Sequence, residues 1–249
     1  MKKNLTIVKI GYVDHLVNFN KVKKWKSNIF DIVDIQTVEY LPNSESDDGY
    51  LDQKFTRESL QSIISCPKNS DFAVAITSYR FTDNFYLHRI KKNCAAISLY
   101  GIKEILESEN ISTENFIIKQ FYEICALSII VNGITNDMEV YNVVHGDTRG
   151  CLFDMNGDRK HIIYNTEKPI ICNSCREKFN KKQISQGIVS TFDKELRKIK
   201  KTNILKIERY IKKYPFISMS ISAIIALTIN FLLKGIWKLL ELLIDKVCK

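Results

Sequence analysis

A run of 19 residues without a charge, from Pro215 to Leu233, constrains this chain more than any other feature. At about 1.5 Å per residue, a helix over this run reaches about 28 Å, close to the ~30 Å hydrocarbon core of a bilayer. The alternative, a helix buried in a soluble core, would be unusual so far from the other predicted elements. We therefore predict a transmembrane helix over residues 214–234, which leaves the preceding residues to form one soluble domain.

The net charge of +9 comes mostly from a short band before this helix. Residues 1–175 carry 20 Lys and Arg against 22 Asp and Glu, whereas residues 176–213 carry 13 against 4. Because positive residues beside a span stay in the cytoplasm, we expect a single-pass protein of the cell inner membrane with a cytoplasmic N-terminal domain. We expect the band to attract anionic membrane lipids. Nucleic acid is disfavoured as a partner, because few base-stacking aromatic residues accompany the basic ones.

The seven cysteines are an odd number, and the N-terminal residues show no signal-peptide pattern. We therefore expect a reducing compartment, where clustered cysteines are more often metal ligands than disulfide partners.

The cysteines cluster with a histidine at spacings typical of a zinc site. Cys172 and Cys175 form a Cys-x-x-Cys knuckle, Cys151 lies 21 residues before it, and His145 lies six residues before that. Zinc in structural sites prefers four tetrahedral sulfur and nitrogen ligands, so these four residues predict one closed, structural Zn²⁺. Cys125 is the reserve ligand in place of His145. The alternatives are reduced cysteines without metal and a redox-active Cys-x-x-Cys.

Apolar periodicity predicts an α+β fold, with a mixed sheet and packed helices, a zinc-bound loop region, a basic helix and the C-terminal membrane helix. We predict strands at 5–10, 35–41, 72–77 and 95–100, and a core helix that begins at Thr113 and ends before Gly133. Residues 42–50 and 137–175 are predicted as loops. The predicted divisions are a cytosolic domain 1–180, a basic juxtamembrane helix 181–213, a membrane helix 214–234 and an amphipathic tail 235–249.

These motifs resemble a known family. Val74-Ala-Ile-Thr77, Asp83-Asn-Phe-Tyr86 and Ala95-Ala-Ile-Ser-Leu99, then a long helix and His145-x5-Cys151-x20-Cys172-x-x-Cys175, are similar to the archaemetzincin branch of the metzincin metalloproteases. The resemblance implies a metzincin-like fold. In that family a helix with His-Glu-x-x-His-x-x-Gly-x-x-His holds a catalytic zinc, and cysteines that end in a Cys-x-x-Cys hold a structural zinc.

The catalytic part of the family pattern is missing. When the helix 114–131 is aligned with the family helix, its one fitting glutamate is Glu123. The three histidines, the glycine and the methionine of the family turn correspond to Tyr122, Ala126, Asn132, Ile129 and Phe153. A glutamate without a metal-bound water has no proteolytic role, so the resemblance implies a pseudoprotease that keeps only the structural zinc.

Two polar groups have alternative interpretations. Asp147 and Arg149, beside the predicted ligands, are expected to brace the zinc loop, and the alternative is a phosphate or carboxylate site. The other group is interpreted as a solvated turn, with the lining of a former substrate cleft as the alternative: Asn84, Tyr86, His88 and Arg89.

The sequence leads to a hypothesis of a membrane-anchored, non-catalytic sensor, effector or interaction module. Its expected partners are lipids, a protein or a second copy of itself, and a small-molecule ligand. The Lys-, Asn- and Ile-rich composition fits a bacterial source, and the layout fits anti-phage effectors that perturb membranes. The first alternative is a membrane-anchored zinc-dependent hydrolase with a rearranged site. The second is a tether that recruits nucleic acid to the membrane.

Overall fold

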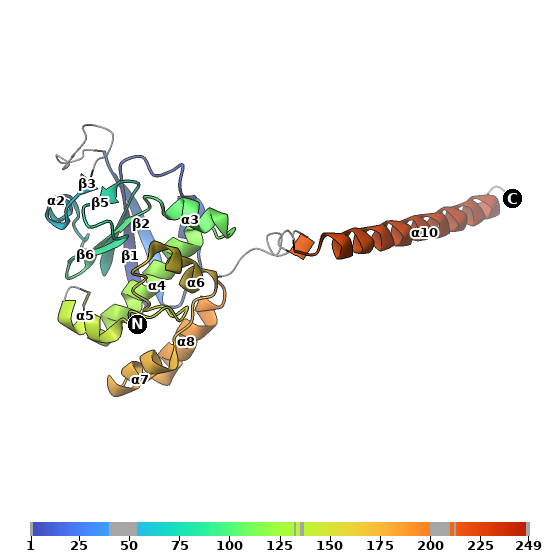
Figure 1. Ribbon diagram of the computed structural model, residues 1–249. Helices are drawn as coiled ribbons and strands as arrows, with labels where there is room; N and C mark the ends of the chain where they lie inside the picture. The colour runs from blue at the N-terminus through green and yellow to red at the C-terminus, as the bar shows by residue number, and fades with distance from the viewer. Residues whose placement is uncertain are drawn as a thin grey trace. The chain divides into compact units, whose positions relative to one another are not determined.

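The computed structural model describes residues 2–39, 54–131, 133–134, 137–199, 210–211 and 213–247. The chain divides into two compact units, Met1–Lys200 and Lys201–Lys249. The predicted fold class is confirmed, because the chain has a mixed sheet with packed helices, a Cys/His cluster and one apolar C-terminal helix (Figure 1). The predicted domain boundaries stay predictions. The predicted loop 42–50 and residues 200–209 and 212 of the predicted basic helix lie outside the described residues.

Two short helices lie between strands in the first part of the chain, and the described elements after the last strand are all helical. The strands are β1 Lys3–Ile10, β2 Phe30–Val38, β3 Lys54–Phe55, β4 Phe72–Thr77, β5 Arg80–Phe81, β6 Leu87–Lys91 and β7 Cys94–Ser98. The helices are α1 Phe19–Lys23, α2 Arg57–Ile63, α3 Ile102–Ser108, α4 Thr113–Val131, α5 Asp137–Val143, the 3-10 turn η1 Arg159–His161, α6 Ile162–Glu167, α7 Asn173–Lys181, α8 Gln186–Leu196 and α10 Pro215–Val247.

The main sheet has the strand order β2-β1-β4-β7-β6. Four strands are parallel, and β6 at one edge is antiparallel to β7. Strand β4 is buried at every position, as expected for a central strand covered on both faces. Because side chains alternate along a strand, Val74 and Ile76 join the larger core, whereas Ala73 and Ala75 join a smaller core. A separate two-stranded sheet pairs β3 with β5.

Helix α4 is the central helix of the first unit, and its predicted start at Thr113 is confirmed. Phe116 and Phe121 are fully buried in the larger core. Helix α8 is joined to α4 by a buried carboxylate, because Glu195 accepts hydrogen bonds from the hydroxyls of Tyr122 at 2.8 Å and Ser27 at 2.6 Å. This contact fixes α8 against α4 and the segment before β2.

Several local predictions were wrong. The predicted strand 35–41 overlaps the end of a longer edge strand, β2, which runs from Phe30 to Val38, and residues 40 and 41 lie outside the described residues. The first half of β2 was missed because acidic residues such as Asp31 and Asp34 interrupt the apolar pattern, as is common on edge strands. The region 137–175 contains α5 and α6 and is not all loop. The basic segment after 176 is broken between α7 and α8, where Gln183 has φ +53° and Ser185 caps α8.

The second unit contains α10, which runs without a break from Pro215 to Val247. Within it, Pro215–Gly235 is long and apolar enough to cross a membrane, by length and composition. At 21 residues it reaches about 31 Å. Taken by itself, the helix leaves large apolar side chains exposed, such as Phe216 at 83% and Phe231 at 82%. Residues 235–247 of the predicted tail 235–249 continue the same helix.

Candidate metal centre

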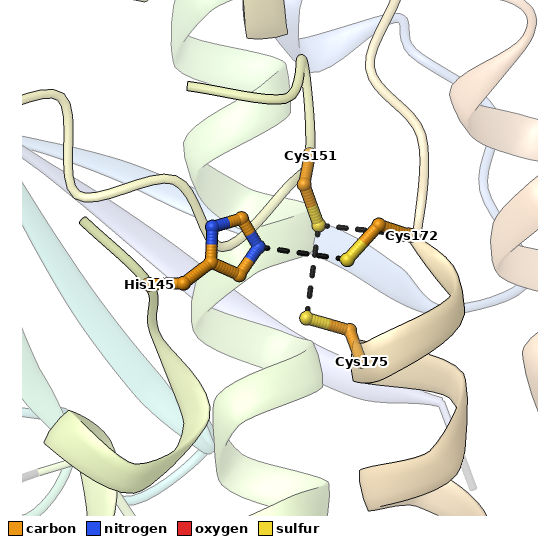
Figure 2. A group of neighbouring side chains, drawn as sticks. All are labelled: His145, Cys151, Cys172 and Cys175. Carbon is orange, nitrogen blue, oxygen red and sulfur yellow. Dashed lines mark hydrogen bonds between the residues drawn. The ribbon is translucent and has the colours of Figure 1, made fainter. Parts of the chain in front are cut away.

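The structure brings all four predicted ligands together (Figure 2). Their ligand atoms all lie within 4.8 Å of one another, although His145 and Cys175 are 30 residues apart in sequence. His145 follows α5, Cys151 lies in the next loop, Cys172 is the N-cap residue of α7, and Cys175 lies in the first turn of α7. The reserve ligand, Cys125, is not a member of this group and is fully buried on α4.

The distances fit a tetrahedral ion. Bond lengths of about 2.3 Å to sulfur and about 2.0–2.1 Å to nitrogen place two sulfurs about 3.8 Å apart, and a sulfur and a nitrogen about 3.6 Å apart. The Sγ atoms of Cys151 and Cys175 are 3.8 Å apart. The Sγ atom of Cys172 is 3.6 Å from Nε2 of His145. The three sulfurs and one nitrogen therefore fit Zn²⁺ in both chemistry and spacing.

Backbone hydrogen bonds hold the loop that carries Cys151. The amide of Leu152 donates to the carbonyl of Ile170 at 2.7 Å, and the amide of Ile170 donates to the carbonyl of Gly150 at 3.1 Å. Gly150 has φ +71°, a left-handed conformation that glycine adopts without strain. The amide of Cys172 donates to the Cys151 sulfur at 3.4 Å. The loop is therefore shaped to turn this sulfur toward the α7 knuckle.

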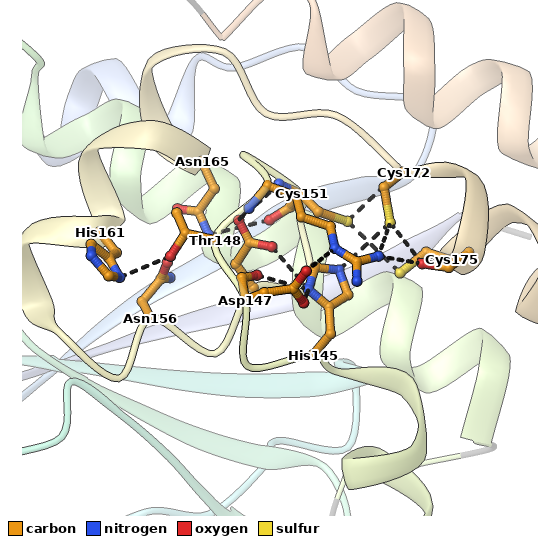
Figure 3. A network of polar contacts seen from close by, with 12 residues as sticks. His145, Asp147, Thr148, Cys151, Asn156, His161, Asn165, Cys172 and Cys175 are labelled. Atoms are coloured by element: carbon orange, nitrogen blue, oxygen red, sulfur yellow. Dashed lines mark hydrogen bonds and ion pairs between the residues drawn. The ribbon is translucent and has the colours of Figure 1, made fainter.

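Polar residues surround the four ligands (Figure 3). Arg149 pairs with Asp147 and donates to the Ser174 hydroxyl at 2.8 Å, and its guanidinium lies 3.9 Å from the Cys172 sulfur. These contacts brace the loop and place a positive charge beside a sulfur. They agree with the bracing role that we predict for Asp147 and Arg149.

Asp154 is a buried residue of the site that sequence reasoning missed. It is 1% exposed, and its Oδ2 accepts hydrogen bonds from the amides of Arg149 at 3.0 Å and Cys151 at 2.9 Å. Its Oδ1 lies 3.1 Å from Nδ1 of His145. A single aspartate three residues after a cysteine has no characteristic spacing, so no sequence pattern distinguishes it from surface aspartates.

The thiols perturb one another strongly. The hydrogen bond from Cys175 lowers the pKa of Cys151 to about 4. The same contact raises the pKa of Cys175. Burial raises the pKa of Cys172, but hydrogen bonds from Ser174 and from the Cys175 amide outweigh burial, and the pKa is lowered. Thiols packed this closely share protons, and a divalent cation that binds them releases those protons.

Helix α4 carries a buried ion pair. Lys119 donates to Glu123 at 2.8 Å, and their side chains are 0% and 7% exposed. With its amide oriented to satisfy both neighbours, Gln120 donates to Glu123 at 2.9 Å and accepts from Lys119 at 3.2 Å. Burial raises the pKa of Glu123, although Lys119 opposes this effect. The network extends to Tyr86, whose hydroxyl also bonds with Gln120.

This ion pair lies beside a pocket of about 420 Å³, of which Glu123 lines one wall. The sequence alignment places Tyr122 and Ala126 at the two histidine positions of the family helix, and neither lines the pocket. The Tyr122 hydroxyl instead bonds with Glu195 and accepts from the Trp25 ring nitrogen at 2.9 Å. Asn132, aligned with the third histidine, lies outside the described residues.

The predicted solvated turn fits the exposed Asn84 but was wrong for Tyr86, His88 and Arg89. Tyr86 is 2% exposed and accepts a hydrogen bond from the Asn156 amide at 2.9 Å, and residues 87–91 form strand β6. Tyr86, His88 and Arg89 line the 420 Å³ pocket. The Tyr86 ring packs against Phe116 of α4 and its hydroxyl bonds with Asn156, and both contacts come from distant parts of the sequence, so the local pattern of polar residues gave no sign of the burial.

No protein-family model and no curated protein sequence matches the chain. Among solved structures, the chain is similar to a crystal structure of archaemetzincin from Methanopyrus kandleri. The two share 9% sequence identity with a TM-score of 0.47, and the match covers 74% of this chain and 96% of that one.

Proposed function

We propose that the chain is a membrane-anchored, non-catalytic relative of the archaemetzincins, which acts as a sensor, effector or interaction module. One structural zinc, held by His145, Cys151, Cys172 and Cys175, braces its cytosolic domain. The observation that carries the non-catalytic part of this proposal is the buried pair of Lys119 and Glu123 on α4.

The ion pair opposes a catalytic metal for electrostatic reasons. In the family motif, two histidines four residues apart on one helix face offer lone pairs to zinc. Tyr122 and Ala126 stand at those positions and offer no such lone pairs. The neighbouring Glu123 is paired with Lys119, whose ammonium group has no lone pair either. A divalent cation there would be repelled by Lys119 and would leave one buried charge without its partner. Without a metal, no water is activated for peptide hydrolysis.

The four-ligand cluster suits a structural role. Protein atoms occupy all four positions of a tetrahedron, so no position remains for a substrate or a water. The ion would tie α5, the Cys151 loop and α7 together. This region lies beside the 420 Å³ pocket, to which Val144, Asp154 and Met155 contribute.

The pocket and the apolar helix α10 support roles in ligand recognition and membrane anchoring. The pocket, beside the edge strand β6, would bind a protein partner or a small ligand, and α10 would hold the domain at the inner face of the cell inner membrane. The basic residues before α10 would attract anionic lipids. We place the protein in bacterial anti-phage defence, where binding at the domain would lead to membrane perturbation. This setting is supported by the architecture alone.

Metal counting on the purified full chain, together with a peptidase assay, tests the proposal. We expect one equivalent of zinc for the native chain and for Glu123→Gln, none for Cys175→Ser, and no peptide hydrolysis by any of them. The alternative is a membrane-anchored zinc-dependent hydrolase with a rearranged site. Two zinc equivalents in the native chain, one of them lost in Glu123→Gln, would establish that alternative instead.

A further inference from the structure

We propose that Asp154, beside the Asp147 carbonyl that bonds with Nδ1, positions His145 for zinc by favouring the tautomer that can ligate through Nε2. The inference rests on the zinc site of the proposed function and assigns a role to a residue that offers no ligand atom itself. It follows from how the two oxygens of one buried carboxylate are used.

The first oxygen of Asp154 is committed to the backbone. Oδ2 accepts from the amides of Arg149 at 3.0 Å and Cys151 at 2.9 Å, so the carboxylate cannot turn without the loss of two hydrogen bonds. Because Cys151 is a predicted ligand, this contact also fixes the loop that carries it. The amide of Met155 donates to the carbonyl of His145 at 3.0 Å, which places the two segments side by side.

The second oxygen faces the imidazole. Oδ1 of Asp154 lies 3.1 Å from Nδ1 of His145 and makes no well-directed hydrogen bond in the described part of the chain. The hydrogen bond of Nδ1 is made with the carbonyl oxygen of Asp147 at 3.1 Å, and an Asp147 carboxylate oxygen lies 3.4 Å from Nδ1. All three groups are acceptors, so the proton belongs on Nδ1. The other nitrogen, Nε2, then keeps its lone pair free and faces the Cys172 sulfur at 3.6 Å.

Substitution of Asp154 by asparagine separates this role from a purely structural one. The amide oxygen of Asn would keep both backbone hydrogen bonds, because two backbone donors exclude the NH₂ group from that position. The NH₂ group would then face Nδ1 and oppose the proton that the Asp147 carbonyl accepts there, which disfavours the tautomer that binds a metal through Nε2. The loop would therefore stay in place while the imidazole becomes a weaker ligand.

Zinc affinity of the full chain in detergent, measured by competition with a chromogenic chelator, provides the test. We expect Asp154→Asn to weaken zinc binding about 10- to 100-fold, the usual effect of the loss of such an outer carboxylate. The matched control is Asp147→Asn, which removes a charge near the same nitrogen but keeps the Asp147 carbonyl. We expect it to change the affinity less than threefold. Equal losses in the two variants would mean that charge alone matters and would overturn the inference.

Cobalt substitution identifies the ligand that is lost. The thiolate-to-cobalt absorption bands of Asp154→Asn should keep the intensity of three thiolates, while the d–d bands should change as a solvent oxygen replaces the imidazole. Unchanged d–d bands with native zinc affinity would overturn the positioning role.

A measurement on the native chain does not depend on whether the variant folds. In a ¹⁵N-histidine NMR spectrum of the zinc-loaded protein, which has only four histidines, we expect His145 with a protonated Nδ1 and a metal-bound Nε2. Zinc bound through Nδ1 would overturn this inference and leave the zinc site intact. A native chain that binds no zinc would overturn both this inference and the proposed function.

Discussion

At the scale of single residues, the feature that decides the chemistry of the pocket wall is the contact between Lys119 and Glu123. The contact is 2.8 Å long and shielded from water, and Gln120 bonds to both partners. A buried pair of this kind contributes little net stability compared with apolar residues, but the loss of one partner is costly because the other charge remains buried. We interpret the pair as a feature that keeps a divalent cation away from Glu123, and not as a stabilising device.

This interpretation predicts the effect of Lys119→Met on stability. The substitution leaves Glu123 buried without its cation, so we expect a loss of about 3–5 kcal/mol in the free energy of unfolding of the first unit. Urea unfolding of the full chain in detergent, followed by tryptophan fluorescence, measures it. Trp25 donates to the Tyr122 hydroxyl, so its signal reports on α4.

The matched control is Lys103→Met on α3, which removes the lysine of another pair spaced four residues apart. Lys103 and Glu107 are 3.7 Å apart with side chains 30% and 61% exposed, so we expect a change within about 0.5 kcal/mol. Similar losses in the two variants would show that Glu123 is not effectively buried. The double variant Lys119→Met with Glu123→Leu should recover most of the lost stability.

At the scale of the elements, α4 was predicted closely because its determinants are local. Thr113 begins it, Gly133 follows its end, and the apolar residues between them recur at helical intervals. The strands β1, β4 and β7 were found for the same reason, since each is a short apolar run. The small sheet was missed because its pairing joins β3 to the distant β5. Strand β6 was missed because His88, Arg89 and Lys91 interrupt its apolar pattern, although it pairs with its neighbour β7.

The candidate metal centre was also predicted only in part from the sequence. The Cys-x-x-Cys knuckle is a local pattern, and its spacing to Cys151 and His145 was sufficient to predict a group that the structure brings together. Asp154 and the pair of Lys119 and Glu123 were missed, because their roles depend on burial and on which helix face meets the pocket. A sequence shows that a carboxylate is present, but not that water is excluded from it.

The N-terminus of α4 gives a prediction for acid conditions. Burial raises the pKa of Glu114, but the Asn18 amide at 2.9 Å and the Lys21 ammonium at 3.2 Å outweigh burial, and the pKa is lowered. A carboxyl whose pKa is lowered on folding stabilises the protein above its unfolded pKa of about 4.3, and this stability is lost as the pH falls through the folded value. Glu114→Gln should therefore cost about 1 kcal/mol at pH 7 and progressively less toward pH 3.

Melting temperatures of the two proteins between pH 7 and pH 3 measure this effect. Their difference should shrink as the pH falls. The control is Glu104→Gln in the first turn of α3, whose side chain makes no hydrogen bond or ion pair within the described residues. A gap between native and Glu114→Gln proteins that stays constant with pH would contradict the assigned contacts.

At the scale of the whole molecule, the candidate metal centre and the apolar helix lie in separate units of the chain. The first unit gathers its metal-ligating side chains and its pocket within residues 54–175, and the second contains a helix whose apolar length matches a bilayer. Zinc removal should therefore loosen the first unit without releasing the chain from membranes. Loss of the apolar helix should release the chain and leave zinc binding intact.

The last prediction tests this independence and the effector proposal together. In bacterial cells, we expect the full chain to remain in the membrane fraction after a 1 M salt wash. The variant Ile225→Asp, with a carboxylate near the middle of the span, should lose this resistance, because a charge there costs about 2.5–3.5 kcal/mol on insertion, whereas Ile225→Leu should not. The truncated chain 1–213 should bind anionic vesicles through its basic residues at low salt. The same wash should remove it, because the Debye length falls to about 3 Å at 1 M. Zinc content should be equal in all four proteins.

If the protein is an effector, growth arrest should follow membrane residence and disappear in Ile225→Asp, while the zinc-free Cys175→Ser chain should still fractionate with membranes. A full chain recovered in the soluble fraction without detergent would contradict the membrane assignment of Pro215–Gly235.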